Sequence, residues 1–167
     1  MTGTERHTLT VLVDNEAGVL ARVVGLFSGR GYNIESLTVA EVDPMAKTSR
    51  ITIVTSGTPQ VIEQIEAQLA RLVPTHRVTN WTSAKAGIER EMALIKVAGT
   101  GDKRMEALRM ADAFRARAVD TTHTSFVFEI TGAPGKIDSF IDLMRPIGLV
   151  DVSRTGVAAI SRGPEAM

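Results

Sequence analysis

The chain has 167 residues, of which 44% are hydrophobic and 23% are charged, so its composition is that of a folded globular protein. Nineteen Lys and Arg balance nineteen Asp and Glu, which gives none of the basic surplus that nucleic-acid binders show. The lack of cysteine excludes disulfides, thiol catalysis and cysteine-held metal or iron–sulfur centres. We expect a cytoplasmic protein, because the N-terminus has no apolar leader and no stretch of about 18 apolar residues follows.

The first half of the chain predicts four strands and two helices. Residues 7–13 alternate polar and apolar side chains, and apolar residues then recur at helical spacing from Val19 until Gly31 stops the pattern. Thr58 and Pro59 predict a second helix start, with a capping side chain followed by proline at the first helical position. The expected elements are strands at 7–13, 33–40, 50–56 and 76–81 and helices at 19–27 and 61–73.

The second half repeats this order. Residues 125–131 alternate apolar and polar side chains as a strand does, and the helix after them is expected to end at Pro146. The expected elements are strands at 92–97, around 119, at 125–131 and at 149–152, and helices at 105–114 and 137–144.

The order βαββαβ is the ferredoxin-like plan, so its repetition predicts an α+β protein of two ferredoxin-like domains. We expect one domain at residues 1–82, a linker at 83–90 and a second domain at 91–167. In this plan the second strand of the first domain lies at a sheet edge, where another chain could pair with it.

Two motifs resemble binding sites but are better explained by the fold. Phe126 and Phe128 could be the stacking aromatics of an RNA-binding sheet, yet their alternation favours core positions. Residues 132–136 resemble part of a phosphate loop, but Ile130 and Ile137 stand where that motif needs Gly and Ser or Thr. This segment is therefore expected to begin a helix.

No residue pattern predicts catalysis. The three histidines, His7, His76 and His123, share no metal-ligand spacing and are expected to be solvated or capping residues. No nucleophile, base and orienting group can be combined from the sequence. We therefore expect neither catalytic residues nor a metal site.

The loop from Asp14 to Gly18 has the strongest functional pattern. It joins a strand to a helix N-terminus, where backbone N–H groups and the helix dipole favour a carboxylate. Gly18 permits close approach of a ligand, and the Asn15 amide offers both a donor and an acceptor, as a zwitterion requires. An amino acid would fit this loop. The alternative is that these are ordinary turn and cap residues.

The same loop lies in a longer run that resembles a known family. DNEAGVLARV at 14–23 and LFSGRGYNIESL at 26–37 are similar to the N-terminal ACT domain of the acetolactate synthase small subunit. IEREMALIKV at 88–97, Gly156 and the SRG run at 161–163 extend the resemblance over almost the whole chain.

The resemblance implies a non-catalytic regulatory subunit. Such a subunit binds the large catalytic subunit, raises its activity and confers feedback inhibition by valine or another branched-chain amino acid. Thiamine diphosphate, Mg²⁺ and FAD would belong to the large subunit, and this chain would hold no cofactor. A free-standing ACT sensor of some other enzyme and a small ferredoxin-fold enzyme are the alternatives.

The resemblance also implies where the effector binds. It places the amino acid between the ACT domains of a homodimer, and it assigns no contact to residues 43–49. One subunit would contribute Asn15, Gly18, Val19 and Leu20, and the other would contribute Asn33 and Ile34.

Overall fold

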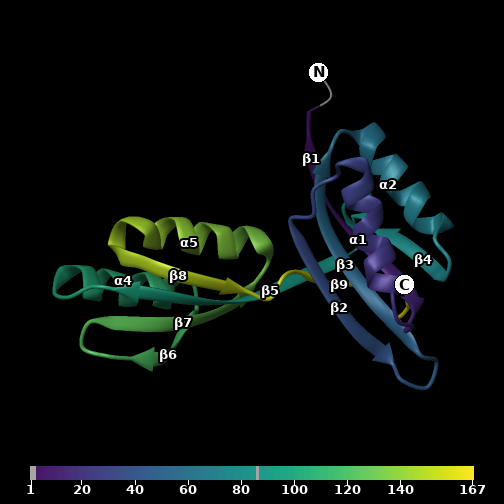
Figure 1. Cartoon of the computed structure of the whole chain (residues 1–167). Helices are drawn as coiled ribbons and strands as arrows, with labels where there is room; N and C mark the ends of the chain where they lie inside the picture. The colour runs from purple at the N-terminus through teal and green to yellow at the C-terminus, as the bar shows by residue number, and fades with distance from the viewer. Residues whose placement is uncertain (1–2, 86) are drawn as a thin grey trace. The chain divides into compact units, whose positions relative to one another are not determined.

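The structure, a computed structural model, describes residues 3–85 and 87–167 and divides into two compact units (Figure 1). Unit 1 comprises Met1–Ile88 together with Val157–Met167, and unit 2 comprises Glu89–Gly156. No helix among the described residues is both long and apolar enough to cross a membrane. Up to Ile88 the chain forms β1 (Glu5–Asp14), α1 (Val19–Arg30), β2 (Ser36–Asp43), β3 (Thr48–Gly57), α2 (Pro59–Arg71), β4 (Thr75–Asn80), α3 (Trp81–Ala84) and the first residues of β5 (Gly87–Ala98).

Unit 1 is an antiparallel sheet with two helices on one face. Its strand order is β2-β3-β1-β4, so β2 lies at the edge as the sequence predicts. Period-two alternation on β1 and β3 places Leu9 opposite Ile53 and Val11 opposite Ile51, all facing the helices. Thr58 caps α2 by accepting a hydrogen bond from the Val61 N–H, as predicted. The buried core residues are Leu9, Val11, Val13, Val19, Val23, Phe27, Ile51, Ile53, Ile62, Ile65 and Leu69.

The other face of this sheet is also covered. Trp81 lies against it, and its indole Nε1 donates to the Thr10 hydroxyl at 2.7 Å. The Arg50 guanidinium lies 5.8 Å from the centre of the Trp81 ring, and burial lowers the pKa of Arg50. Val157 and Ala159, from the end of the chain, are buried as well. In a two-layer fold this face of the sheet would be exposed to solvent, whereas here its residues are buried.

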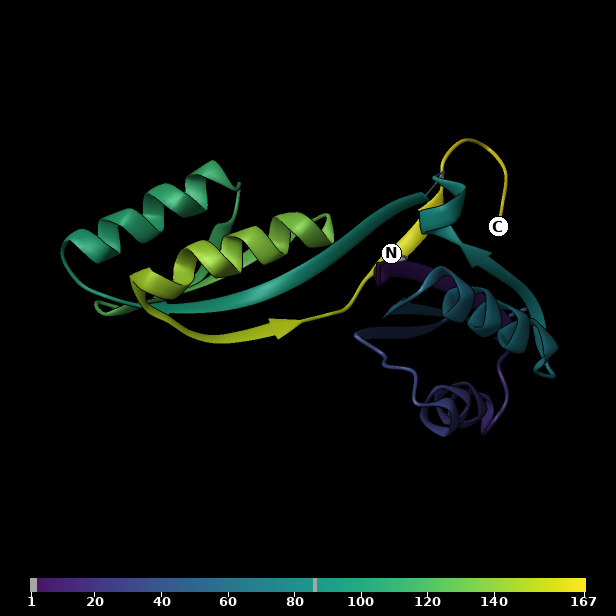
Figure 2. The same cartoon turned by 90° about the horizontal axis from the view of Figure 1, so that it is seen from above.

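Unit 2 repeats the plan with α4 (Asp102–Ala113), β6 (Arg117–Thr121), β7 (Ser125–Gly132), α5 (Pro134–Gly148) and β8 (Leu149–Arg154). Its order is β6-β7-β5-β8, and the short β9 (Ala158–Ser161) pairs with β5 off that path. Figure 2 shows α4 and α5 on the same side of the sheet. Each strand thus has the position of its counterpart in unit 1, which confirms the predicted repeat.

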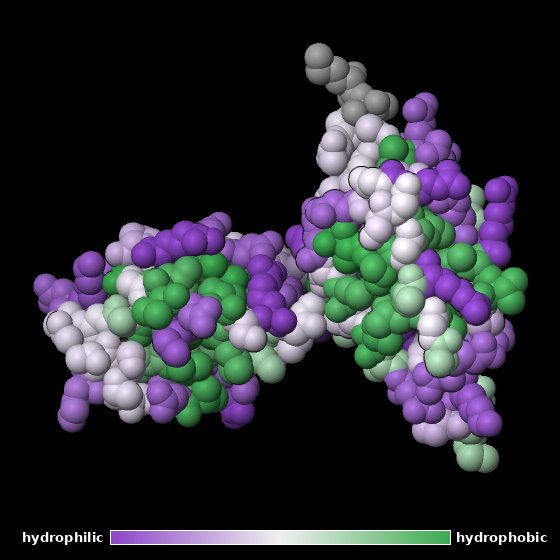
Figure 3. Space-filling view, in the orientation of Figure 1, coloured by the Kyte–Doolittle hydropathy of each residue, from purple (hydrophilic) through white to green (hydrophobic). Residues whose placement is uncertain are grey.

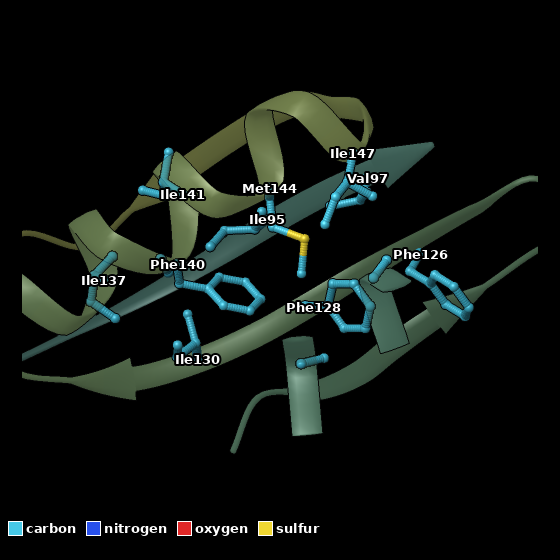
Figure 4. Packing of buried hydrophobic residues seen from close by; sticks show 13 residues of the cluster. Ile95, Val97, Phe126, Phe128, Ile130, Ile137, Phe140, Ile141, Met144 and Ile147 are labelled. Atoms are coloured by element: carbon cyan, nitrogen blue, oxygen red, sulfur yellow. The ribbon is translucent and has the colours of Figure 1, made fainter. Parts of the chain in front are cut away.

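Aromatic rings fill the centre of unit 2. Phe126 and Phe128 stack with ring centroids 5.1 Å apart, and Phe140 of α5 meets Phe128 edge to face at 6.2 Å (Figure 4). Both strand phenylalanines are almost fully buried, so the core interpretation is confirmed. Around them lie Ala93, Ile95, Val97, Ala107, Ala111, Ile130, Ile137, Ile141, Met144 and Ile147.

The structure corrects the predicted linker at 83–90. The Asn80 side chain accepts hydrogen bonds from the N–H groups of Thr82 and Ser83, both at 3.1 Å, and so caps α3. β5 then begins at Gly87, where a Cβ would lie 2.9 Å from the Trp81 ring, so only glycine fits without displacement. Helix and strand therefore occupy most of a segment that was expected to be irregular.

The domain ends also differ from the expectation. The second domain was predicted to run over 91–167, but Val157–Met167 belong to unit 1 and include the unpredicted strand β9. α5 was predicted to end at Pro146 and instead continues to Gly148. Pro146 lies in the last turn and has no N–H to donate to the carbonyl of Asp142, so α5 passes through it without that hydrogen bond.

An ion pair between a buried carboxylate and a partly exposed arginine joins β5 and β8 in unit 2. The Glu91 side chain is 3% exposed, and both of its oxygens accept from Arg154, whose Nη2 lies 2.8 Å from Oε2. Arg154 Nη1 also donates to Asp138 of α5 at 2.7 Å. The hydrogen bonds to Glu91 raise the pKa of Arg154, so the guanidinium stays charged.

Replacing Arg154 tests this pair. Arg154→Met leaves the Glu91 carboxylate buried without its cation, and we expect a loss of about 3 kcal/mol in the free energy of unfolding, measured with urea. The matched control is Arg145→Met, which removes an exposed ion pair to Asp142 and should cost less than about 0.5 kcal/mol. Equal losses in the two variants would contradict a special role for the buried pair.

Candidate functional site

The loop between β1 and α1 is fixed to its neighbours at two residues. Asp14 donates its N–H to the Pro74 carbonyl at 3.2 Å, and its Oδ1 lies 2.5 Å from Nε2 of His76. The Asn15 N–H donates to the Lys47 carbonyl at 2.7 Å, and the Asn15 Oδ1 accepts from the Ser49 hydroxyl at 3.0 Å. These contacts hold the loop before any ligand binds.

Helix α1 begins at the end of this loop without a capping side chain. Its N-cap is Gly18, whose φ of 84° lies in the left-handed region that favours glycine. A Cβ on Gly18 would meet no atom within 4 Å, so the space beside it is open. The N–H groups of Leu20 and Ala21 lie in the first turn, where N–H groups have no partner inside the helix.

This arrangement presents donors suited to a carboxylate. The first-turn N–H groups and the positive end of the helix dipole favour an anion. Because Oδ1 of Asn15 is held by Ser49, the amide orientation is set, and its Nδ2 has no protein partner among the described residues. The Leu20 side chain is 40% exposed and offers an apolar surface next to these donors.

Val19 differs from the other loop residues. Its side chain is 5% exposed and belongs to the core of unit 1, so only its backbone is available to a ligand. Its N–H points back to the Glu16 carbonyl at 3.4 Å. The apolar contact with a ligand therefore falls to Leu20.

Asn33 and Ile34 lie away from this loop within one chain. They precede β2, which begins at Ser36 and not at Asn33 as predicted. Ser36 pairs with Val54 of β3, whereas Asp14 pairs with Thr48, six residues along the same strand. At about 3.3 Å per residue, the two predicted parts of the site lie about 20 Å apart along the sheet.

The residues that position Asn15 were not found from the sequence. Lys47 and Ser49 belong to a stretch to which the sequence assigned no contact, and only the pairing register of β1 with β3 brings them beside Asn15. His76 was expected to be a solvated or capping residue, and its contact with Asp14 likewise depends on strand pairing. None of these three positions has a local sequence signal.

The remaining titratable clusters are structural. Among the described residues no group of three or more His, Asp or Glu side chains could hold a metal ion. His7, expected to be solvated or capping, is instead 6% exposed, and its Nδ1 lies 3.1 Å from Nδ2 of Asn80. This contact supports the residue that caps α3 and leaves the loop at Asp14–Gly18 as the candidate site.

Comparisons with known proteins place both halves of the chain in one family. Residues 9–77 match the family described as AHAS small subunit-like ACT domain, and residues 90–163 match the family described as small subunit of acetolactate synthase. A probable acetolactate synthase small subunit of Archaeoglobus fulgidus is 46% identical over 95% of this chain and 98% of that protein. The isozyme 3 small subunit of Escherichia coli is 44% identical over 97% and 99%.

A solved structure supports the same assignment. The acetolactate synthase small subunit from Thermotoga maritima superimposes with a TM-score of 0.81 and 37% identity, covering 96% of this chain and 99% of that one. Matches to both halves and to relatives of the same length confirm the resemblance noted in the sequence. The chain therefore belongs to the acetolactate synthase small subunits, the non-catalytic regulatory subunits of that enzyme.

Proposed function

We propose that this chain activates the acetolactate synthase large subunit and makes it sensitive to feedback inhibition by valine or another branched-chain amino acid. The effector binds at the loop Asp14–Gly18. The observation that supports this most is the uncapped start of α1 at Gly18, beside the oriented amide of Asn15. A backbone carboxylate site with a neighbouring side-chain amide is suited to the two charged groups of an amino acid.

The effector's side chain contacts Leu20. This residue is 40% exposed at the start of α1, so an aliphatic ligand that covers it removes apolar surface from water. One methylene changes such an interaction by about 1–3 kcal/mol. Valine, leucine and isoleucine are therefore expected to bind with overlapping affinities.

The binding site is completed in a homodimer. β2 is an edge strand, and Val39 and Val42 on it are 45% and 50% exposed, which favours pairing with a second chain. Figure 3 shows hydrophobic surface over this part of unit 1. Antiparallel pairing of two β2 edges brings Asn33 and Ile34 of one chain to the end of the sheet where the other chain has its Asp14–Gly18 loop.

The large catalytic subunit is the protein partner. That subunit binds thiamine diphosphate, Mg²⁺ and FAD, and the complex is cytoplasmic. Inhibition requires that valine bind one arrangement of the complex more tightly than another, and a coupling of about 1–3 kcal/mol is typical.

The direct test is acetolactate formation by the cognate large subunit, with and without this chain. We expect the chain to raise the rate and to make it fall on titration with a branched-chain amino acid. If the chain neither binds nor stimulates the large subunit, the assignment fails, and a free-standing ACT sensor becomes the better interpretation.

Substitution of Gly18 tests the carboxylate site. Gly18→Asp places a negative charge where the effector carboxylate binds, whereas Gly18→Asn adds a side chain of the same size that also tolerates the left-handed backbone. By calorimetry we expect valine to bind the Asp variant at least about tenfold more weakly than the Asn variant, because like charges repel. Similar valine affinities in the two variants would show that this loop does not bind the effector carboxylate.

A mixed dimer tests whether two chains build each site. One subunit has Gly18→Asp and the other Asn33→Ala, so a site shared between chains gives one pocket with both changes and one with neither. We expect valine to bind the purified mixed dimer at half of the wild-type stoichiometry. If Gly18 and Asn33 served the same chain's pocket, each pocket would have one change, and no wild-type affinity would remain.

A further inference from the structure

The last segment of the chain returns to unit 1 and is bound there through its backbone. We call Val157–Ser161 the C-terminal strap. Its Val157 N–H donates to the Ser36 hydroxyl at 3.1 Å, and its Val157 carbonyl accepts from the Thr38 hydroxyl at 2.9 Å. The Arg50 guanidinium donates to the Ala159 carbonyl at 2.7 Å.

These contacts are partly buried. Val157 is 1% exposed and Ala159 is 7% exposed, on the sheet face that also buries Trp81. In such surroundings an unmade hydrogen bond costs more than one at the surface, because water cannot replace it. The strap therefore has a defined position on β2 and β3 of unit 1.

Unit 2 is thus connected to unit 1 at both ends. The chain enters unit 2 along β5 and leaves it after Gly156, and the entering strand and the leaving segment are joined inside unit 2. There the Thr155 N–H donates to the Met92 carbonyl at 3.0 Å, and the Met92 N–H donates to the Thr155 hydroxyl at 3.1 Å. Unit 2 is therefore attached through two chain segments that are hydrogen-bonded to each other, and not through a single linker.

The strap is attached next to the predicted effector residues. Ser36 and Thr38 are the first and third residues of β2, and Ser36 follows Ile34 by two positions. The segment between is fixed to β3, because the Thr55 hydroxyl donates to the Asn33 carbonyl at 2.6 Å and the Glu35 N–H donates to the Val54 carbonyl at 2.8 Å. A ligand that moves Asn33 therefore moves the start of β2 as a unit.

We propose that Ser36, Thr38 and Arg50 are positioning residues that couple the effector site to unit 2 through the C-terminal strap. This inference rests on the proposed function. The path of contacts runs from Asn33 and Ile34 into β2, where the Ser36 and Thr38 hydroxyls bind the backbone of Val157. Val157 directly follows Gly156, the last residue of unit 2. Effector binding changes the position of β2, and the strap passes that change to the strands that connect unit 2.

The test separates binding of valine from its effect. The double variant Ser36→Ala with Thr38→Val removes both hydroxyl partners of Val157 with little change in volume. Arg50→Met, as a second variant, removes only the contact with Ala159. The control is Ser161→Ala, whose hydroxyl belongs to the same strap but donates to the Glu165 carbonyl.

Valine binding is measured by calorimetry on each full-length small subunit, and inhibition is measured on each reconstituted complex. For the double variant we expect valine affinity within about twofold of wild type, while the valine concentration for half-inhibition rises at least about fivefold, the low end of ordinary coupling. Arg50→Met should change in the same direction, and Ser161→Ala should behave as wild type.

Three results would overturn the proposal. Full inhibition of both the double variant and Arg50→Met would show that the strap does not transmit the effect. Loss of valine binding in variants that remain folded and dimeric would show that the hydroxyls shape the site itself. Equal loss of inhibition in Ser161→Ala would show that the effect does not depend on the contacts of Ser36, Thr38 and Arg50. A wild-type complex that valine does not inhibit would instead refute the proposed function.

Discussion

The regulatory account depends on the unsatisfied backbone N–H groups at the start of α1. A helix begins with donors that have no partner inside the helix, and most helices supply a capping side chain. Here the N-cap is Gly18, which has no side chain to give, and the loop before it is fixed by strand pairing and by Asn15. In the proposed function these donors bind a ligand, and the positive helix end favours a carboxylate.

The two units share one order of strands and helices, but they differ in how the faces of the sheet are covered. In unit 1, helices cover one face, and Trp81 with the C-terminal strap covers the other. This second layer is made of residues far apart in sequence, so it forms only when the chain on both sides of unit 2 has come together. Unit 2 is thereby an insertion between two parts of unit 1, and β2 is joined by hydrogen bonds to Val157, the residue that follows unit 2.

The repeated element order was predictable because it depends on local patterns. Alternation on β1 and β7, the Thr58 cap and the glycine after α1 are each visible within a few residues of sequence. The loop at Asp14–Gly18 could also be singled out, because its glycine and its amide lie in one short stretch, and its role as an effector site stays a prediction.

The other features depend on residues distant in sequence. The predicted linker is helix and strand because Asn80 caps α3 and Trp81 packs against Gly87. β9 is short and has no alternation that distinguishes it from a loop, and Ser49 reaches Asn15 only through the register of β1 and β3. Tertiary contacts decide such positions, and a single sequence does not display them.

The central claim is that an amino-acid site exists only where two chains meet. Sedimentation velocity over a range of chain concentrations, with and without saturating valine, tests it most directly. Because a ligand stabilises the species that binds it, the account predicts that valine shifts the equilibrium toward the dimer. A monomer–dimer equilibrium that valine leaves unchanged, while calorimetry shows valine bound to the chain, would contradict the claim.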